Sequence, residues 1–181
     1  VRGVYEPGPG SCPPETAAPI SVYDPFENIT LAPADFTAQG VRITSTSYGD
    51  GCNDGYTASA QTVDRQTRLQ PALLHVFSAG NSGTSNCGFL TGWGNITGGN
   101  KSGKNVLAVG AVDRNDQLAG FSSRGPATDG RVKPDICAVG VDVNSTLSNN
   151  TYGNNSGTSM ACPGMSGTAA ALYHLWRARH G

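Results

Sequence analysis

The sequence lacks the features that mark membrane-spanning, nucleic-acid-binding and zinc-binding proteins. No apolar run approaches the roughly 20 residues that a bilayer-spanning helix needs. Charged side chains make up only 14% of the 181 residues, and the net charge is −1. This balance gives no electrostatic basis for binding nucleic acid or an anionic membrane surface. The five cysteines form no Cys-x-x-Cys pair, which argues against a zinc knuckle or a thioredoxin-type redox site.

Glycine and small polar residues are abundant instead, with 25 glycines in the chain. Such a neutral, turn-rich composition is typical of many secreted enzymes, so we expect a secreted, extracellular protein. Cys52 and Cys87 each follow an apolar stretch. In an oxidising compartment they could form a disulfide, and whether they do so or stay free is left open by the sequence. Cys137 and Cys162 lie among apolar or small residues, and we expect both to be buried free thiols.

The chain divides into two parts at about residue 40. Residues 1–40 hold seven prolines, which remove backbone donors and break helices, so we expect an irregular segment there. A strand, a helix and a strand within about 40 residues then predict a parallel βαβ unit and an α/β fold with a mostly parallel sheet. Strands are expected over residues 41–47, 73–79 and 106–112 and within 136–143, a hairpin over 143–152, and helices over 57–69 and 159–179.

A serine at the start of the last predicted helix is the first candidate for chemistry. Ser159 lies in the segment Asn-Ser-Gly-Thr-Ser-Met-Ala-Cys-Pro, residues 155–163. Its hydroxyl would lie near the positive end of the helix macrodipole, but serine is a weak nucleophile without a neighbouring base. In the alternative interpretation, Ser159 only caps the helix. The Gly-x-Ser-x-Gly elbow of α/β-hydrolases does not fit, because residue 161 is alanine.

An asparagine after a buried strand is the second candidate. Residues 78–83, Ser-Ala-Gly-Asn-Ser-Gly, end the strand expected over 73–79. Ligands of open α/β sheets bind beyond the carboxyl ends of the strands. Asn81 could donate there to an oxygen that becomes negative during acyl transfer. In the alternative interpretation, Asn81 is an ordinary turn residue. Found together in this order, the two motifs indicate a catalytic site much more specifically than either motif does alone.

With the segments Gly-Phe-Ser-Ser-Arg-Gly-Pro (residues 120–126) and Lys-Pro-Asp-Ile (residues 133–136), the chain resembles the subtilisin-like serine peptidases, the subtilases. The resemblance runs from about residue 41 to residue 181 and implies a three-layer fold with a mostly parallel central sheet. It implies that Ser159 is the nucleophile and Asn81 an oxyanion-hole residue. It also implies two backbone segments that form the walls of the primary specificity pocket, namely Ser47, Tyr48 and Gly49, and Ser78, Ala79 and Gly80.

Two motifs of the subtilases are absent from the sequence. Their catalytic aspartate lies in an Asp-Ser/Thr-Gly turn and their histidine in a His-Gly-Thr helix start, and neither occurs here. His174 and His180 would lie roughly 22 and 30 Å from Ser159 along one helix. His75 would precede Asn81 by about 20 Å on one strand. We therefore expect residues 41–181 to be the carboxyl-terminal part of a subtilase catalytic domain, incomplete at its N-terminal side. The missing half would normally cover the sheet edge.

The predicted function is that of a serine endopeptidase acting through an acyl-enzyme on Ser159, with the aspartate and histidine absent from this chain and the chain inactive without them. The alternative is a non-catalytic relative that binds peptides as an interaction module. The expected partners are a peptide or protein substrate and the missing half of the domain, without nucleic acid or membrane. No cofactor is assigned. Many subtilases bind calcium, and Asp50, Asn53 and Asp54 form an oxygen-rich turn, although an ordinary turn is the favoured interpretation.

Overall fold

The computed structural model describes residues 37–38, 40–49, 52, 55–96 and 98–180. The predicted irregular segment 1–40 lies almost entirely outside the described residues, and so do Asp50, Asn53 and Asp54 of the oxygen-rich turn. The described elements are β1 (Ile43–Thr46), α2 (Ala58–Leu69), β2 (Leu74–Ser78), η1 (Gly99–Ser102), β3 (Leu107–Val112), β4 (Ile136–Val139), β5 (Val143–Leu147), η2 (Ser148–Asn150), β6 (Thr151–Asn155) and α3 (Thr158–His180).

Four strands form a parallel sheet in the order β1-β2-β3-β4. β1 and β2 pair in parallel from Ile43 opposite Leu74 to Thr46 opposite Phe77, and α2 connects them. The predicted parallel βαβ unit is therefore confirmed. β5 and β6 form the predicted antiparallel hairpin, which leads into α3.

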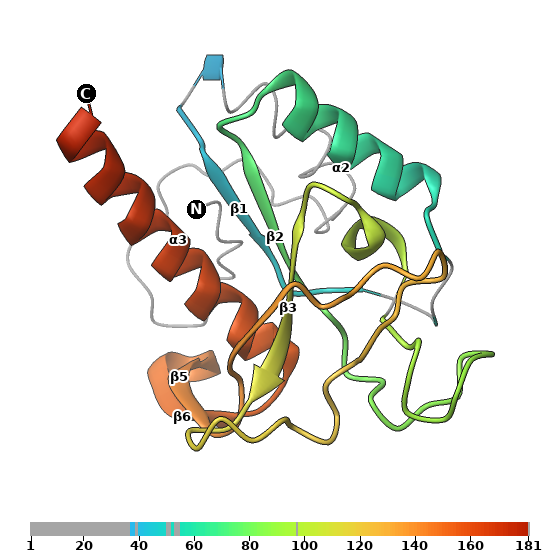
Figure 1. The fold of residues 1–181 in the computed structure, drawn as a ribbon. Helices are drawn as coiled ribbons and strands as arrows, with labels where there is room; N and C mark the ends of the chain where they lie inside the picture. The colour runs from blue at the N-terminus through green and yellow to red at the C-terminus, as the bar shows by residue number, and fades with distance from the viewer. Residues whose placement is uncertain (1–36, 39, 50–51, 53–54, 97, 181) are drawn as a thin grey trace.

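Helices cover the two faces of this sheet (Figure 1). Neighbouring side chains of a strand point to opposite faces, and in β2 they meet different helices. Val76 packs in a cluster with Ala161 and Cys162 of α3, whereas Phe77 packs with Val63 of α2. The fold is thus α/β with three layers and a parallel central sheet, as predicted.

The two ends of α3 differ in burial. The first half packs on the sheet, and its buried residues include Thr158, Ala161 and Cys162. In the second half Leu172, Leu175 and Trp176 are 60%, 56% and 59% exposed. The helix therefore presents a wide apolar surface at its carboxyl end that no described residue covers. None of the described helices is both long and apolar enough to cross a membrane.

The cysteines decide one open alternative, confirm one expectation and contradict another. Cys52 and Cys87 form a disulfide, and Cys162 is a buried free thiol. Cys137 is free but exposed, so the expectation that it is buried was wrong. It lies on β4, the outermost strand of the described sheet on that side, where Ile136 and Val139 are also exposed. Because this exposure follows from the strand order, the apolar neighbours of Cys137 in the sequence could not reveal it.

Candidate active site

The carboxyl ends of β1 and β2 and the amino end of α3 meet at one edge of the sheet. Ser47 follows β1, Gly80 and Asn81 follow β2, and Ser159 lies in the first turn of α3. Gly80 turns the chain after β2 with a φ of 110°, a backbone conformation that favours glycine over other residues. The fold therefore brings together segments that are far apart in the sequence.

Ser159 is a partly buried residue, and its hydroxyl points toward the segment that follows β1. Its Oγ donates to the carbonyl oxygen of Ser47 at 3.0 Å, and the Oγ of Ser47 donates to the carbonyl oxygen of Ser159 at 2.9 Å. This reciprocal pair fixes the distance between the two segments. The amide N–H of Ser159 lies in the first turn of α3, where helix geometry supplies no intrahelical acceptor. A negative oxygen near Ser159 would meet both this N–H and the positive end of the helix dipole.

The side chain of Asn81 is held in one orientation by Thr158. Its Oδ1 accepts from the backbone N and from the Oγ1 of Thr158, both at 2.9 Å. A backbone N–H can only donate, so the atom that faces it must be Oδ1 and not Nδ2. The amide Nδ2 is therefore left on the other side of the group as a donor. The Oγ1 of Thr158 in turn accepts from the N–H of Gly80 at 3.1 Å, so the turn and the amide are fixed by one buried hydroxyl.

These groups surround one pocket of about 340 Å³. It is lined by residues 47–49, Ser78, residues 80–82, Lys101, Thr158 and Ser159. Of the eight residues singled out in the sequence, the structure thus brings seven to one pocket. Ala79 does not line it, because its side chain is fully buried and its N–H donates to the carbonyl oxygen of Val109 at 2.9 Å.

Two close backbone approaches hold the segment before Ser159 and the turn that carries Asn81 in place. The N–H of Gly157 donates to the carbonyl oxygen of Gly140 at 2.8 Å, and a Cβ on Gly140 would lie 2.7 Å from the carbonyl oxygen of Gly157. The N–H of Ser123 donates to the carbonyl oxygen of Gly80 at 2.9 Å. The segment 120–126, one of the motifs that carry the resemblance, therefore supports the turn that carries Asn81.

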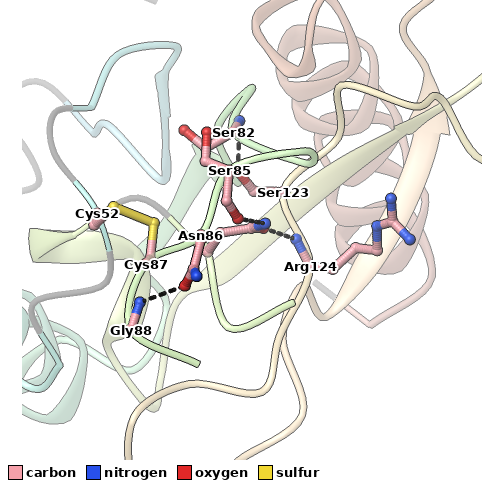
Figure 2. The surroundings of a disulfide bond; sticks show 9 residues. Cys52, Ser82, Ser85, Asn86, Cys87, Gly88, Ser123 and Arg124 are labelled. Atoms are coloured by element: carbon pink, nitrogen blue, oxygen red, sulfur yellow. Dashed lines mark hydrogen bonds between the residues drawn. A yellow bond between two sulfur atoms is a disulfide. The ribbon is translucent and has the colours of Figure 1, made fainter. Parts of the chain in front are cut away.

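A disulfide joins Cys52 and Cys87, which lie in the segments that follow the two walls of the pocket (Figure 2). Cys52 follows the wall at residues 47–49, and Cys87 follows the wall that ends at Asn81. Figure 2 also shows the N–H of Ser82 donating to the Oγ of Ser123, at 3.0 Å. Both walls are thus tied down at points outside the strands themselves.

All three histidines of the chain lie among the described residues, and none lines this pocket. His75 is fully buried in β2, and its Nδ1 lies 2.7 Å from the Oγ1 of Thr44. Burial lowers the pKa of His75 to about 4, so its imidazole is neutral at pH 7. His174 and His180 lie in the exposed last turns of α3.

Sequence reasoning missed three residues that line the pocket: Ser82, Lys101 and Thr158. Thr158 is next to Ser159 within the same motif, so the sequence could have indicated that it lies at the pocket. Lys101 lies in a Gly- and Asn-rich stretch without hydrophobic periodicity, and nothing local in the sequence points to it.

The arrangement of a helix-start serine, an anchored asparagine amide and a flanking pocket invites comparison with known proteins. A model of the subtilase family, Peptidase_S8, matches residues 21–177. The chain belongs to the subtilase family. The match begins within residues 1–40, for which the motifs alone offered no counterpart.

Curated subtilases match the chain over part of their length. It is 38% identical over 136 residues to subtilisin DY of Bacillus licheniformis, a match that covers 75% of the chain and 44% of the relative. It is 36% identical over 133 residues to alkaline elastase YaB of a Bacillus species, covering 74% of the chain and 30% of the relative. The chain therefore spans less than half the length of these relatives.

Solved structures of subtilases show the same fold. The prenylagaramide maturation protease PagA matches with a TM-score of 0.67 and 27% identity, covering 88% of the chain and 53% of PagA. The self-cleaved protease domain of PatA matches with a TM-score of 0.62 and 28% identity, covering 80% of the chain and 50% of that domain. Family and fold thus support a serine peptidase function.

Proposed function

We propose that this chain carries the nucleophile, the oxyanion hole and the primary specificity pocket of a serine endopeptidase. The observation that carries the proposal is that the hydroxyl of Ser159 and the oriented amide of Asn81 line one pocket. An acyl-transfer site needs a nucleophile and a donor for the oxyanion on the same reacting carbonyl, and these two groups supply that pair.

In the proposed reaction, Ser159 Oγ attacks the peptide carbonyl while its proton passes to a histidine. The histidine then gives this proton to the leaving amine as the peptide C–N bond breaks, and water hydrolyses the resulting acyl-enzyme to release the acid and restore the Ser159 hydroxyl. The negative oxygen of each tetrahedral intermediate accepts from Asn81 Nδ2 and from the N–H of Ser159. The backbone of residues 47–49 pairs with the extended substrate as an added strand. For this, the Ser159 hydroxyl must leave the carbonyl oxygen of Ser47, its partner in this structure.

The catalytic histidine and aspartate would come from a segment outside these 181 residues. A general base must come within about 3 Å of the serine hydroxyl. His174 lies fifteen residues beyond Ser159 on α3, roughly 22 Å along the axis, and His75 is buried against Thr44. The exposed apolar end of α3 and β1, the outermost strand on one side of the described sheet, would offer such a segment a surface on which to dock. We call the chain together with this segment the complemented protein.

The disulfide supports an extracellular location. Disulfides persist in oxidising compartments and are rare in the cytosol, and Cys52 and Cys87 are joined here. Calcium binding stays a prediction, since the oxygen-rich turn at residues 50–54 falls mostly outside the described residues.

The second candidate function is a peptide-binding module without catalysis. The bond between the Ser159 hydroxyl and the Ser47 carbonyl is the observation that favours it, because in this bond the hydroxyl proton is donated to a carbonyl oxygen and not to a general base. The coding sequence that adjoins this chain distinguishes the two candidates. An Asp-Ser/Thr-Gly and a His-Gly-Thr segment encoded there support the enzyme, and their absence supports the module.

Replacing Asn81 tests the proposed reaction. In the complemented protein, Asn81→Leu should lower kcat by about 10²–10³-fold, the usual cost of losing one oxyanion donor, with KM little changed. Steady-state kinetics on a peptide substrate measure both constants. The matched control is Asn86→Leu, an exposed asparagine of the same loop whose Oδ1 accepts from Gly88 N, and its kcat should stay within about twofold. An unchanged kcat for Asn81→Leu would exclude the proposed role.

A further inference from the structure

Several asparagines of the chain begin an Asn-x-Ser/Thr sequence, the acceptor motif of N-linked glycosylation. They are Asn28, Asn95, Asn100, Asn144, Asn149 and Asn154. The motif alone is a weak signal, because it is short and this chain is rich in asparagine, serine and threonine. The structure describes all of these asparagines except Asn28 and places them in different surroundings. Their surroundings therefore distinguish which of them can carry an oligosaccharide.

Two of these asparagines are buried in the fold. Asn95 is fully buried, and its Nδ2 donates to the carbonyl oxygen of Ser85 at 3.2 Å while its Oδ1 accepts from Arg124 N at 2.8 Å. Asn100 lies in η1 and is 8% exposed. An N-linked oligosaccharide is bulky and strongly hydrated. Neither of these amides has room for one in the folded chain.

Two others contact each other across the β5–β6 hairpin. Asn144 and Asn154 are opposite each other in the ladder, and Asn144 Nδ2 donates to Asn154 Oδ1 at 2.9 Å. Both residues are exposed, but a sugar on either amide would crowd the partner to which that amide is bonded. We therefore expect both to be poorer acceptors than a free amide.

Asn149 lies at the tip of the same hairpin, where no described residue engages its side chain in a hydrogen bond. It is exposed, and so are the residues on either side of it. Its φ is 60°, in the left-handed region that asparagine adopts more readily than most residues. Thr151 completes the motif, and its Oγ1 donates to the carbonyl oxygen of Ser148 at 2.9 Å. The whole motif thus forms an exposed turn with a free amide.

We propose that Asn149 is the acceptor site of an N-linked oligosaccharide. The donor is an oligosaccharide carried on a polyprenyl diphosphate. A bond forms between Asn149 Nδ2 and the anomeric carbon of the first sugar, and the bond from that carbon to the diphosphate oxygen breaks. The polyprenyl diphosphate leaves, and the amide nitrogen loses one of its two protons.

Two further observations fit this modification. Glycosylation of this motif is a feature of secreted proteins, and the disulfide between Cys52 and Cys87 also fits an oxidising compartment. Asn149 does not line the pocket of Ser159. It is separated from the start of α3 by the five residues of β6, roughly 16 Å of extended chain. The proposal is therefore independent of the proposed peptidase function.

Peptide mapping of the chain secreted by a eukaryotic cell tests the proposal. Enzymatic removal of N-linked glycans converts each modified asparagine to aspartate, so mass spectrometry of the peptides identifies the modified positions. We expect conversion of Asn149 in most of the folded protein, whereas Asn95 and Asn100 should remain asparagine. An unconverted Asn149 in the folded chain without substitutions would overturn the proposal. Conversion of Asn144 or Asn154 without Asn149 would overturn it as well.

Substitutions in the hairpin tip sharpen the test. Asn149→Gln should lower the mass of the intact secreted chain by one oligosaccharide, because glutamine is not an acceptor. The matched control is Asn150→Gln, which changes the exposed neighbour, with a φ of 56°, but keeps the Asn-x-Thr motif and should keep the glycan. Thr151→Ser should also keep it, whereas Thr151→Val should lose it although Asn149 is present. An unchanged glycan mass in Asn149→Gln or in Thr151→Val would contradict the assignment, and the second variant serves if the first is not secreted.

Discussion

The first and the last turns of α3 differ in how much of the chain packs against them. The first turns are fixed by the chain itself, through Thr158 bonded to Asn81 and Ser159 bonded to Ser47. The last turns expose Leu172, Leu175 and Trp176, each more than half accessible. Large exposed apolar patches mark interaction surfaces. Under the proposed function, one end of the helix would hold part of the active site, and the other end would offer a surface for the segment that completes it.

The largest effect should come from placing a charge at the exposed end of α3. Trp176→Asp should abolish docking of the complementing segment, so that peptidase activity falls by at least about 100-fold, because burying an unpaired carboxylate costs several kcal/mol. The stability of the isolated chain should change by less than about 0.5 kcal/mol, since the residue is exposed there. Activity assays and thermal melts of the same variant measure the two effects.

Val132→Asp is the control for that substitution. Val132 is apolar and 85% exposed, but it lies in the loop before β4 and not on α3. Its activity should remain within about twofold of the unmodified protein. Equal losses of peptidase activity in the two variants would show that the carboxyl end of α3 is not the docking surface.

The next largest effect should come from removing the disulfide near the first turns of α3. Cys52→Ser opens the link between the two pocket walls, which closes a loop with a sequence separation of 35 residues. Loss of such a loop constraint should lower the free energy of unfolding by about 3–4 kcal/mol. Chemical denaturation measures this change, with Cys137→Ser as the control because Cys137 is a free, exposed thiol. A loss of equal size in the two variants would contradict the role given to the disulfide.

A smaller effect should follow from acid, at the end of β2 away from the site. Burial lowers the pKa of His75 from 6.5 to about 4, so the folded state prefers the neutral imidazole. The unfolded chain takes up the proton first as the pH falls, so stability is full above about pH 6.5 and declines toward pH 4. The loss attributable to His75 is about 3 kcal/mol.

Unfolding free energies at pH 7, 6 and 5 test this, with His75→Gln as the comparison because glutamine stays neutral throughout. The slope should be smaller in His75→Gln than in the unmodified chain. Parallel slopes would mean that His75 does not titrate on unfolding.

The sequence predicted the fold well where local pattern decides structure. The apolar run at β2 and the Gly- and Pro-free stretch at α2 specify a buried strand and a helix with few competing options. Ser159 and Asn81 were singled out because each lies in a motif whose chemistry needs that residue type, and both line one pocket in the structure. Lys101 and the exposure of Cys137 were not predictable, because both depend on which segments become neighbours in space. No pattern within η1 or β4 carries that information.

Labelling of Ser159 with a fluorophosphonate probe tests the central claim most directly, since the probe reacts with a serine only when a base activates it. We predict labelling at Ser159 in the complemented protein, none in its Ser159→Ala variant, and only background labelling of the isolated chain. Labelling of the isolated chain at the same rate as the complemented protein would contradict the need for an outside histidine. Absence of labelling at Ser159 in a folded complemented protein would contradict the active site itself.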